Sequence, residues 1–425
     1  MATPPRARIL VLGGGFGGLF FVKALRAKHN DIVLVDRQNH HLFQPLLYQV
    51  ATAGLAAPQI AQPIRQILSG RKNLRVLLGE VEAVDLKSRT VRLAGRSEPL
   101  TYDYLVYGLG VVNDYFGHSE WARHARGMKS LEDAAVIRRD LLLALEAAES
   151  SEDPDQVRRL LTVVVIGGGP TGVELAGAIA DLVRHARRDF TRVELGVTRV
   201  VLVEKGPRLL AHLPEDLSAS AERQLASLGV EVRTNVGVAD ITAGRVQLDD
   251  GTELLAETIL WAAGVRAAPS TVGLGVPLDR AGRLEVLPDL SLPGHPEAFA
   301  VGDAVSLVDP RGVRVPGVSP AAMQMGAFVA REISARVAGA APSGRAFVYR
   351  DKGSMATIGR KSAVAHLAGM KLSGFPAWIT WLVVHLLFLI GFRNKLQVVV
   401  NWISSYLFYR PGARVVSTPE PPPLS

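Results

Sequence analysis

Two stretches of the chain share one order of apolar and glycine positions. In each, a short apolar run leads into a glycine-rich turn, GGGFGG at 13–18 and GGGPTG at 167–172, about 150 residues apart. A mainly apolar segment follows the turn, and a second apolar run then ends in an acid, Asp36 or Glu204. This order predicts a strand, a tight turn, a helix and a second strand, which together form a dinucleotide-binding fingerprint. Two fingerprints predict that the chain binds two dinucleotides at once.

The remaining pattern predicts an α/β fold with a doubly wound sheet and an antiparallel excursion. A hairpin signal stands at Asp250-Gly251, the charged stretch 130–151 is helical in character, and 38–54 contains polar and turn residues. The apolar run within 296–305 ends in Gly302-Asp303, and we expect it to return to the first sheet. The strand-like runs are 73–93, 102–110, 229–241, 245–254 and 258–265.

The returning strand implies that the second dinucleotide unit is inserted into the first. We expect the first domain to be split between residues 1–125 and 286–345. The inserted domain should cover 126–285, and a C-terminal segment of different composition should cover 346–425.

Charge and cysteine content narrow the chemistry. The 425 residues carry a formal net charge of +8 and include no cysteine. A redox-active disulfide is therefore excluded, as are thiolate-bound metals and iron–sulfur clusters, and we expect no metal site. No basic run interleaved with aromatics points to nucleic acid, so we expect the positive charge to face anionic lipid. Paired dinucleotides without a disulfide suit an enzyme in which a flavin takes electrons from a nicotinamide and passes them directly to a docked acceptor.

The acid after the second fingerprint bears on the choice of nicotinamide. A carboxylate such as Glu204 accepts hydrogen bonds from ribose hydroxyls, and it would repel the 2′-phosphate of NADPH. We therefore expect NADH to be preferred. Lys205 and Arg208 follow closely and could soften that preference.

Two further acids are candidates for function. Glu174 is expected in the first turn of the second fingerprint helix, where the helix dipole stabilises a carboxylate. Simple charge complementarity and a role near the nicotinamide–flavin junction are both consistent with that position. Asp303 would stand at the end of the returning strand, where it could accept a hydrogen bond from the ribityl chain of a flavin.

The segment 372–392 is an uncharged, aromatic-rich apolar run of about 20 residues, which is near the length of a membrane span. Its proline and its central His385 argue against a spanning helix. Its tryptophan pair, its basic flank and a second apolar run at 396–408 favour helices that lie on a membrane surface. A buried core helix and a partner interface remain alternatives. We expect His385 to be a satisfied polar group rather than a catalytic base.

The chain resembles the type II NADH dehydrogenases, which are single-chain, non-pumping NADH:quinone oxidoreductases. The resemblance covers nearly the whole chain and rests on GGGFGG with HHLFQPLLYQVATAG, on GGGPTGVELAG, LWAAGV and AFAVGDAV, and on DKGSMATIGR with the tail LIGFRNKL…NWISSYLFYRPGAR. It implies two Rossmann-like domains, FAD at the first, NADH at the second and a C-terminal membrane-associating helical segment.

The resemblance also assigns residues. Around FAD it implies Gly13, Gly15, Phe16, Gly17, Gly18, Asp36, Arg37, Gly110, Gly302 and Asp303. Around NADH it implies Gly167, Gly169, Pro170, Thr171, Gly172, Glu204, Ala263 and Gly264. It places Glu174 near the nicotinamide and flavin, and it implies catalytic roles for Glu174, Gln324 and Lys352. The implied quinone-binding residues are Ala322, Gln324 and Lys352.

The quinone signature of the family is altered in this chain. Where members commonly have Ala-Gln-x-Ala-x-Gln, residues 319–324 read SPAAMQ, so Pro320 replaces the first glutamine. Proline supplies neither a side-chain amide nor a backbone donor. A membrane quinone, ubiquinone or menaquinone, remains the expected acceptor. The alternatives are a soluble NADH-dependent flavin reductase with a non-quinone acceptor, and a nucleotide-sensing binding protein.

The expected location follows from both ends of the chain. No apolar signal region precedes the first strand, which starts almost at once, so we expect the protein to stay in the cytoplasm. Together with the C-terminal helices, this predicts a peripheral, monotopic protein on the cytoplasmic side of the cell inner membrane. A homodimer is a further expectation from the resemblance.

Overall fold

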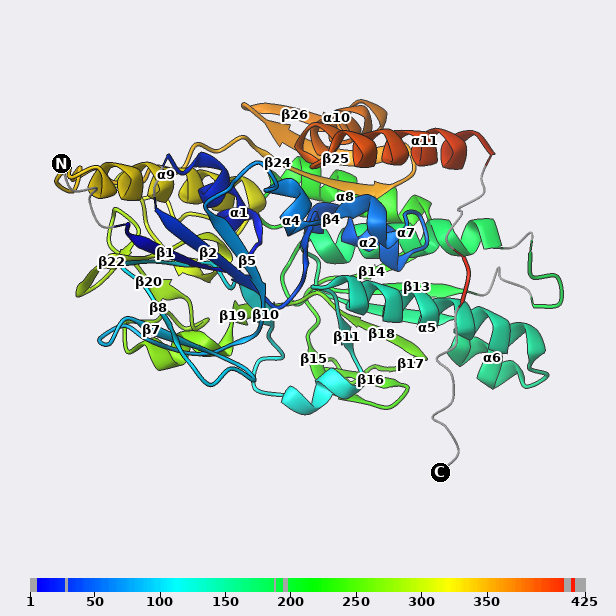
Figure 1. Cartoon of the computed structure of the whole chain (residues 1–425). Coiled ribbons are helices and arrows are strands. Elements are labelled where there is room, and N and C mark those ends of the chain that lie inside the picture. Colours follow the sequence, from blue (N-terminus) through cyan, green and yellow to red (C-terminus); the bar gives the residue numbers. More distant parts are fainter. Residues whose placement is uncertain (1–5, 27–29, 187–188, 194–197, 409–413, 417–425) are drawn as a thin grey trace. The chain divides into compact units, whose positions relative to one another are not determined.

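The computed structural model describes residues 6–26, 30–186, 189–193, 198–408 and 414–416. The chain divides into two compact units (Figure 1). The first consists of Met1–Leu42, Ala61–Val112 and Val265–Lys352. The second consists of Phe43–Ile60, Asn113–Gly264 and Gly353–Ser425.

A six-stranded sheet forms the centre of the first unit. Its order is β21 (Ser291–Leu292), β22 (His295–Ala300), β9 (Tyr104–Tyr107), β1 (Arg8–Leu12), β2 (Asp31–Asp36) and β5 (Leu74–Leu78). All neighbours are parallel except β21 with β22. The pairing of β22 with β9 confirms that the chain returns to the first sheet near residue 300.

Helix α1 (Phe16–Ala24) lies beside helix α9 (Ser319–Val337) over this sheet (Figure 1). The two helices approach so closely that a Cβ on Gly326 would overlap the carbonyl oxygen of Gly17. The predicted antiparallel excursion is confirmed as the sheet of β6 (Val81–Asp85), β7 (Thr90–Leu93) and β8 (Leu100–Thr101).

Short elements complete the first unit. They are β3 (His40–Leu42), β4 (Ala61–Pro63), α4 (Ile64–Ile67), β19 (Val265–Ala267), η4 (Pro269–Leu274), β20 (Leu284–Glu285), η5 (Gly302–Ala304) and β23 (Val305–Ser306). The strand β10 (Val111–Asn113) stands where the chain leaves this unit.

The second unit is built on a five-stranded parallel sheet. Its order is β11 (Arg126–Gly127), β18 (Thr258–Trp261), β12 (Thr162–Ile166), β13 (Arg199–Val203) and β14 (Val230–Arg233). One face packs on an antiparallel sheet of β15 (Val238–Thr242), β16 (Arg245–Leu248) and β17 (Glu253–Leu255), and Val164, Val201 and Ile259 lie in the shared core. The β16–β17 pairing confirms the hairpin predicted at Asp250-Gly251.

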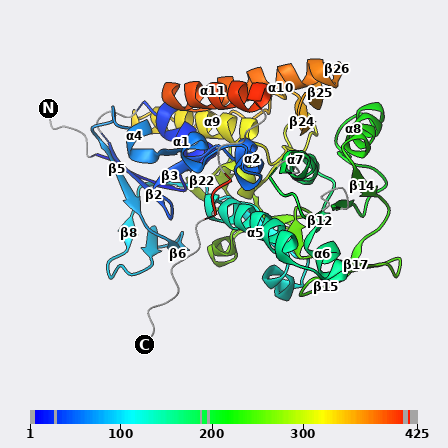
Figure 2. The ribbon, with the colours of Figure 1, turned by 90° about the vertical axis from the view of Figure 1, so that its right-hand side faces the viewer.

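Helices pack against the same parallel strands (Figure 2). They are α5 (Leu131–Ser150), α6 (Pro154–Leu160), α7 (Pro170–Ala186) and α8 (Glu215–Ser227). The predicted helix at 130–151 is confirmed, and its start has a local cause. Ser130 caps α5 and exchanges hydrogen bonds with Asp133 in a capping box.

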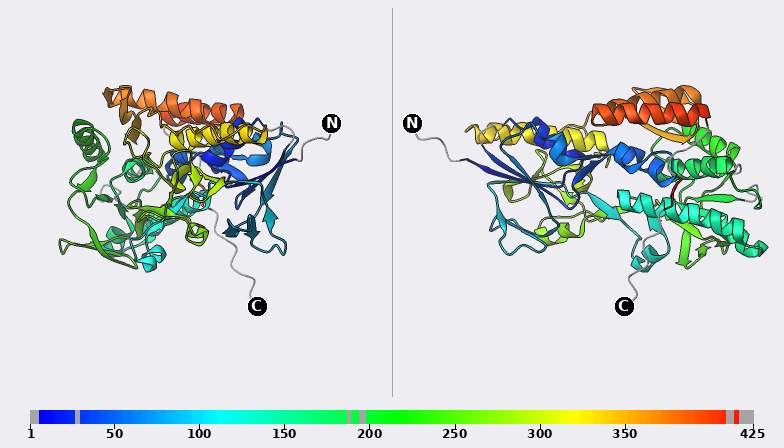
Figure 3. Two further views of the ribbon diagram at one scale, coloured as in Figure 1. Left: turned by 90° about the vertical axis from the view of Figure 1, so that its left-hand side faces the viewer. Right: turned by 45° about the vertical axis from the view of Figure 1, so that its right-hand side comes forward.

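The C-terminal part of the chain is built onto helix α7. Strands β24 (Ser354–Gly359), β25 (Ser362–Leu367) and β26 (Met370–Ser373) form an antiparallel sheet. Strand β24 lies so close to α7 that a Cβ on Gly177 would overlap the carbonyl oxygen of Ile358. Helix α10 (Phe375–Phe388) packs on β25 through Trp378, and α11 (Phe392–Phe408) follows (Figure 3).

Segment 43–60 also belongs to this unit, and helices that the polar and turn residues of 38–54 did not predict begin at Gln44. The segment forms η1 (Gln44–Leu46), α2 (Leu47–Ala51) and α3 (Ala57–Ile60). Its apolar side chains are buried, including Leu47 and Val50. Asn401 on α11 donates to Gln59 at 2.9 Å and ties the last helix to this segment. None of the helices among the described residues has the length and hydropathy needed to cross a membrane.

Candidate functional site

The first fingerprint forms an open cradle at the start of α1. Gly13 has φ +97°, and a Cβ there would overlap the carbonyl oxygen of Gly108. A Cβ on Gly18 would overlap the carbonyl oxygen of Gly13, whereas Gly15 is exposed with no atom near its missing Cβ. Helix α1 has no side-chain N-cap and no acid in its first turn. An uncapped helix start beside the open space at Gly15 suits the pyrophosphate of a dinucleotide.

Asp36 fastens the end of β2 to this turn. Its Oδ2 accepts the Gly14 N–H at 2.5 Å and its Oδ1 accepts the Gln38 N–H at 2.7 Å. Burial raises the pKa of the carboxyl above its usual value. Each oxygen keeps acceptor capacity, which a ribose hydroxyl could use.

A buried histidine supports the same turn from below. His41 Nδ1 donates to the carbonyl oxygen of Gly14 at 3.0 Å, and its ring packs edge-on against Phe16. Burial lowers the pKa of His41 to about 4, so the ring is neutral near pH 7.

The other residues implied for FAD lie at the carboxyl ends of neighbouring strands. Gly110 follows β9, Gly302 and Asp303 follow β22, and the exposed Arg37 follows β2. The Gly302 N–H donates to Met325 Sδ at 3.3 Å. Ligands of open α/β sheets bind at this edge, so the residues fit a dinucleotide here.

The second fingerprint repeats the cradle at the start of α7. Gly167 has φ +112°, and a Cβ there would stand 2.6 Å from Ala262. A Cβ on Gly172 would overlap the carbonyl oxygen of Gly167, and Gly169 again borders open space. Pro170 and Thr171 are exposed in the first turn of α7, which has no acid. This cradle therefore also suits a pyrophosphate.

Glu204 binds the glycine turn of the second unit as Asp36 binds that of the first. Its Oε2 accepts the Gly168 N–H and its Oε1 accepts the Gly206 N–H, each at 2.6 Å. The nearby Arg208 is not available to bind a ligand beside Glu204, because its guanidinium is already hydrogen-bonded to protein groups. Its guanidinium donates to the carbonyl oxygens of Ala211 and Leu213 and to Ser218 Oγ.

Ala263 and Gly264 follow β18 at the same edge of the sheet, beside an exposed aromatic that the sequence did not suggest. Phe116 is 62% exposed, adopts φ +53° and covers Gly264 so closely that a Cβ there would overlap its ring. The Asp114 N–H donates to the Gly264 carbonyl oxygen at 3.1 Å and holds the two segments together.

Glu174 does not stand in the first turn of its helix, so that expectation was wrong. Helix α7 begins at Pro170, which places Glu174 one turn further on, against β24. The Thr357 N–H donates to its carboxyl group, but burial dominates and raises the pKa of Glu174 to about 8. The carboxyl is therefore mostly protonated at neutral pH.

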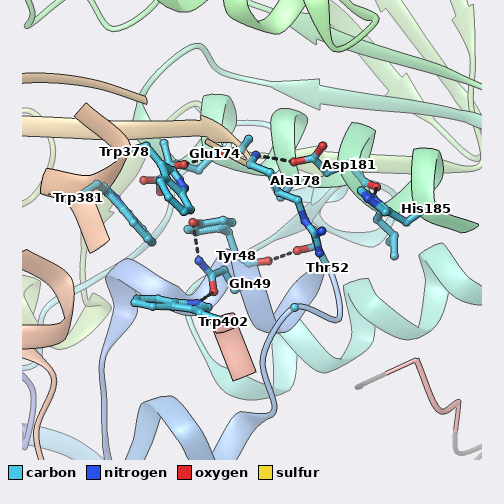
Figure 4. A pocket seen from close by; sticks show the side chains of 15 residues that line it. Tyr48, Gln49, Thr52, Glu174, Ala178, Asp181, His185, Trp378, Trp381 and Trp402 are labelled. Atoms are coloured by element: carbon cyan, nitrogen blue, oxygen red, sulfur yellow. Dashed lines mark hydrogen bonds between the residues drawn. The ribbon is translucent and has the colours of Figure 1, made fainter. Parts of the chain in front are cut away.

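Glu174 lines a pocket of about 90 Å³ within the second unit (Figure 4). Polar residues from α7 and β24 line it together with residues of α2 and an aromatic wall from α10 and α11. They include Tyr48, Gln49, Thr52, Ala178, Asp181, His185, Thr357, Arg360, Trp378, Trp381 and Trp402.

Hydrogen bonds order this pocket at both ends. At one end the Arg360 N–H donates to Asp181 Oδ2 at 2.7 Å, and His185 Nδ1 donates to the Asp181 carbonyl oxygen at 2.6 Å. At the other, Trp402 Nε1 donates to Gln49 Oε1, and Gln49 Nε2 donates to the Tyr48 hydroxyl, each at 2.9 Å (Figure 4).

Gln324 and Lys352 belong to the first unit. The Gln324 amide exchanges two hydrogen bonds of 3.0 Å with the main chain of Arg350, two residues before the exposed Lys352. Ala322 is buried behind Gly302. Pro320 lies in the first turn of α9, where a missing N–H costs no helical hydrogen bond.

His385 is a satisfied polar group, as expected. Its Nδ1 donates to the Trp381 carbonyl oxygen at 2.8 Å, its ring stacks on Trp381, and burial lowers its pKa to about 4.

The sequence interpretation missed most of the pocket. Asp181 and His185 follow Glu174 at helical spacing, so their common face was visible in the sequence. Tyr48 and Arg360 reach the pocket through contacts between distant segments, and no local signal marks them.

Comparison with known proteins agrees with this geometry. The model of the pyridine nucleotide-disulphide oxidoreductase family matches residues 7–326, and that of the NDH2 C-terminal domain matches 352–411. The type II NADH:quinone oxidoreductase Ndh of Mycobacterium tuberculosis is 42% identical over 98% of this chain and 92% of its own length. The mitochondrial internal alternative NAD(P)H-ubiquinone oxidoreductase A1 of Arabidopsis thaliana is 30% identical over 96% and 86%.

A solved structure supports the fold. NDH2 from Plasmodium falciparum in complex with NADH superposes with a TM-score of 0.89 at 20% identity, covering 96% of this chain and 99% of that one. The chain therefore belongs to the pyridine nucleotide-disulphide oxidoreductase family and, within it, to the type II NADH:quinone oxidoreductases.

Proposed function

We propose that the chain is an FAD-dependent NADH:quinone oxidoreductase that transfers a hydride from NADH to FAD and two electrons to a membrane quinone, without pumping protons. The observation that carries this proposal is the pair of matching open cradles in a chain that has no cysteine. A disulfide relay is impossible, so the electrons must pass directly to an acceptor.

The first unit would hold FAD and the second NADH. Backbone N–H groups beside Gly15 and Gly169 would bind the two pyrophosphates, and Asp36 and Glu204 would accept from the riboses. Bound FAD supplies the two-electron chemistry, while the protein orients the partners and excludes water. The Arg208 guanidinium is engaged by the carbonyl oxygens of Ala211 and Leu213, so it would not be available to bind a 2′-phosphate on the adenine ribose beside Glu204, which favours NADH.

Gln324, Lys352 and Glu174 would each contribute to reduction of the quinone. We assign Gln324 the task of holding the segment that leads to Lys352, because its amide clamps the main chain of Arg350. Lys352 would stabilise negative charge that develops during reduction. Glu174 would hold a proton at neutral pH and give it up to the acceptor, as its raised pKa allows.

The C-terminal helices would attach the protein to a membrane. Their exposed apolar residues recur at spacings of three or four, which gives each helix one apolar face. These residues are Phe375, Ile379, Val383 and Leu387 on α10, each 41% to 67% exposed, and Leu396, Val400 and Ile403 on α11. Arg393 lies beside them and would meet anionic lipid. The proposed location is peripheral, on the cytoplasmic side of the cell inner membrane.

Stopped-flow spectroscopy tests the proposal. NADH should bleach the flavin, and ubiquinone or menaquinone analogues should restore it. Fast bleaching that no quinone reverses would exclude a quinone acceptor. Protein reconstituted alone into vesicles should generate no membrane potential during turnover, and a potential would contradict the absence of pumping.

A further inference from the structure

Helix α7 presents a row of titratable side chains to the pocket. Glu174, Asp181 and His185 are separated by seven and four residues, and all three line the cavity, with Ala178 between them. Helix geometry places positions at these intervals on one face, about 10 Å and then about 6 Å apart along the axis. The row therefore begins at Glu174, one turn into α7, and ends at His185, next to the last residue of the helix.

The size of the pocket identifies what it can hold. Small-molecule sites usually enclose about 300–1,000 Å³, whereas this pocket offers about 90 Å³. A water molecule occupies roughly 30 Å³ of liquid, so the pocket has room for a short row of waters.

An unsatisfied donor also favours water. Trp381 lines this pocket, and its buried indole N–H has no hydrogen-bond partner among the residues that the structure describes. A buried donor without a partner costs about 1–3 kcal/mol, and an ordered water would recover that cost.

Three arginines place positive charge near the row. Arg360 faces both Asp181 and His185, and Arg184 lies near Asp181. Arg414 adds positive charge near His185. Because His185 Nδ1 donates to the Asp181 carbonyl oxygen, its Nε2 is the ring nitrogen that can accept a proton.

The proposed reaction needs such a route. Oxidation of NADH releases a hydride, which carries one proton and two electrons, whereas reduction of a quinone to a quinol consumes two protons. One proton must therefore enter from solution in every turnover.

We propose that His185 and Asp181, linked by water in this pocket, conduct that proton from solvent to Glu174. This inference rests on the proposed quinone reductase function and adds two residues to it. Asp181 and His185 do not touch the quinone in this scheme; they reload the group that does the protonation. Burial raises the pKa of Asp181 and lowers the pKa of His185.

Substitutions in the FAD-loaded, full-length protein test the path. Asp181→Asn keeps an oxygen that can accept the Arg360 N–H, and His185→Gln keeps a polar side chain at the other position. We expect both variants to be reduced by NADH at the wild-type rate. Reoxidation by a soluble quinone should slow by at least about tenfold, more so as pH rises, and added imidazole should restore part of the rate.

Asp216→Asn is the matched control. Asp216 is an exposed carboxylate on α8 that pairs with Lys371 outside the pocket, so this variant should behave as wild type. Both Asp181→Asn and His185→Gln reoxidising at the wild-type rate with the wild-type pH profile would overturn the path while leaving the proposed function intact. Slowing that imidazole does not relieve and that pH does not change would show a structural role instead. Wild-type protein that no quinone reoxidises would contradict the proposed function itself.

Discussion

The two glycine cradles are nearly identical in their backbone but are followed by different helices. Gly13 and Gly167 make the same left-handed turn, Gly18 and Gly172 pack against it in the same way, and the glycine between each pair faces open space. Helix α1 then packs its small residues against α9, whereas α7 carries Glu174, Asp181 and His185 along a pocket. In the proposed mechanism, nucleotide binding is therefore duplicated, while the proton chemistry is confined to the second unit.

The largest effect should come from filling either turn. In Gly18→Ala the added Cβ overlaps the main chain, so FAD content should fall severely and take all activity with it. Gly172→Ala makes the same overlap in the second cradle. This variant should keep its FAD, as flavin absorbance would report. The rate of flavin reduction by NADH, measured by stopped flow, should fall by at least about 100-fold.

Substitutions at the open glycines are the matched controls. Gly15→Ala and Gly169→Ala add a Cβ into empty space, so folding and thermal stability should change little in either variant. Equal damage from Gly169→Ala and Gly172→Ala in the absence of nucleotide would contradict the geometry described for these turns.

Removing the proton from Glu174 should have the next largest effect. Because its pKa is raised, the carboxyl is protonated below about pH 8 and loses its proton above that value. The wild-type rate of quinone reduction should therefore fall as pH rises through about 8. Glu174→Gln should lose about 100-fold or more and lose this inflection, while reduction by NADH persists. An unchanged inflection in this variant would assign it to another group.

Neutralising the acids that follow each cradle should separate the two nucleotides. Glu204→Gln removes the charge that repels a 2′-phosphate, so the preference for NADH over NADPH should fall by about tenfold. Asp36→Asn should weaken FAD binding without changing that preference. Steady-state kinetics with both nicotinamides measures the first effect and FAD titration the second. A change of nicotinamide preference in Asp36→Asn would break the assignment.

The smallest effect should come from the aromatic beside the second cradle. Phe116→Ala removes an exposed ring over Gly264, so the KM for NADH should rise by about threefold with FAD content unchanged. This substitution leaves the hydrogen bond to Gly264 in place, because the main-chain N–H of Asp114 donates it. A wild-type KM would show that Phe116 does not meet the nucleotide.

The sequence predicted what depends on local pattern. The apolar run, the glycines and the following acid are contiguous, so both cradles, the hairpin at Asp250-Gly251 and the return of β22 could be read directly. The position of Glu174 within α7 was misjudged because helix starts are uncertain by a few residues, and here the helix begins at Pro170.

The pocket could not be predicted in the same way. Tyr48, Arg360 and Trp381 each lie more than 100 residues from α7 in the sequence, and only tertiary packing brings them to this helix. The effect of Pro320 on the quinone signature also depends on its place in the fold. In the first turn of α9 a proline is well accommodated, so the altered signature does not disturb the helix that carries Gln324.

Proton uptake during quinone reduction tests most directly whether proton chemistry belongs to the second unit. NADH-reduced protein is mixed with quinone in weak buffer, and an indicator dye and the flavin are followed in one stopped-flow trace. Wild-type protein should take up one proton per quinone in step with flavin reoxidation, and Glu174→Gln should slow both signals together. Proton uptake and reoxidation at wild-type rates in Glu174→Gln would contradict the role given to this helix.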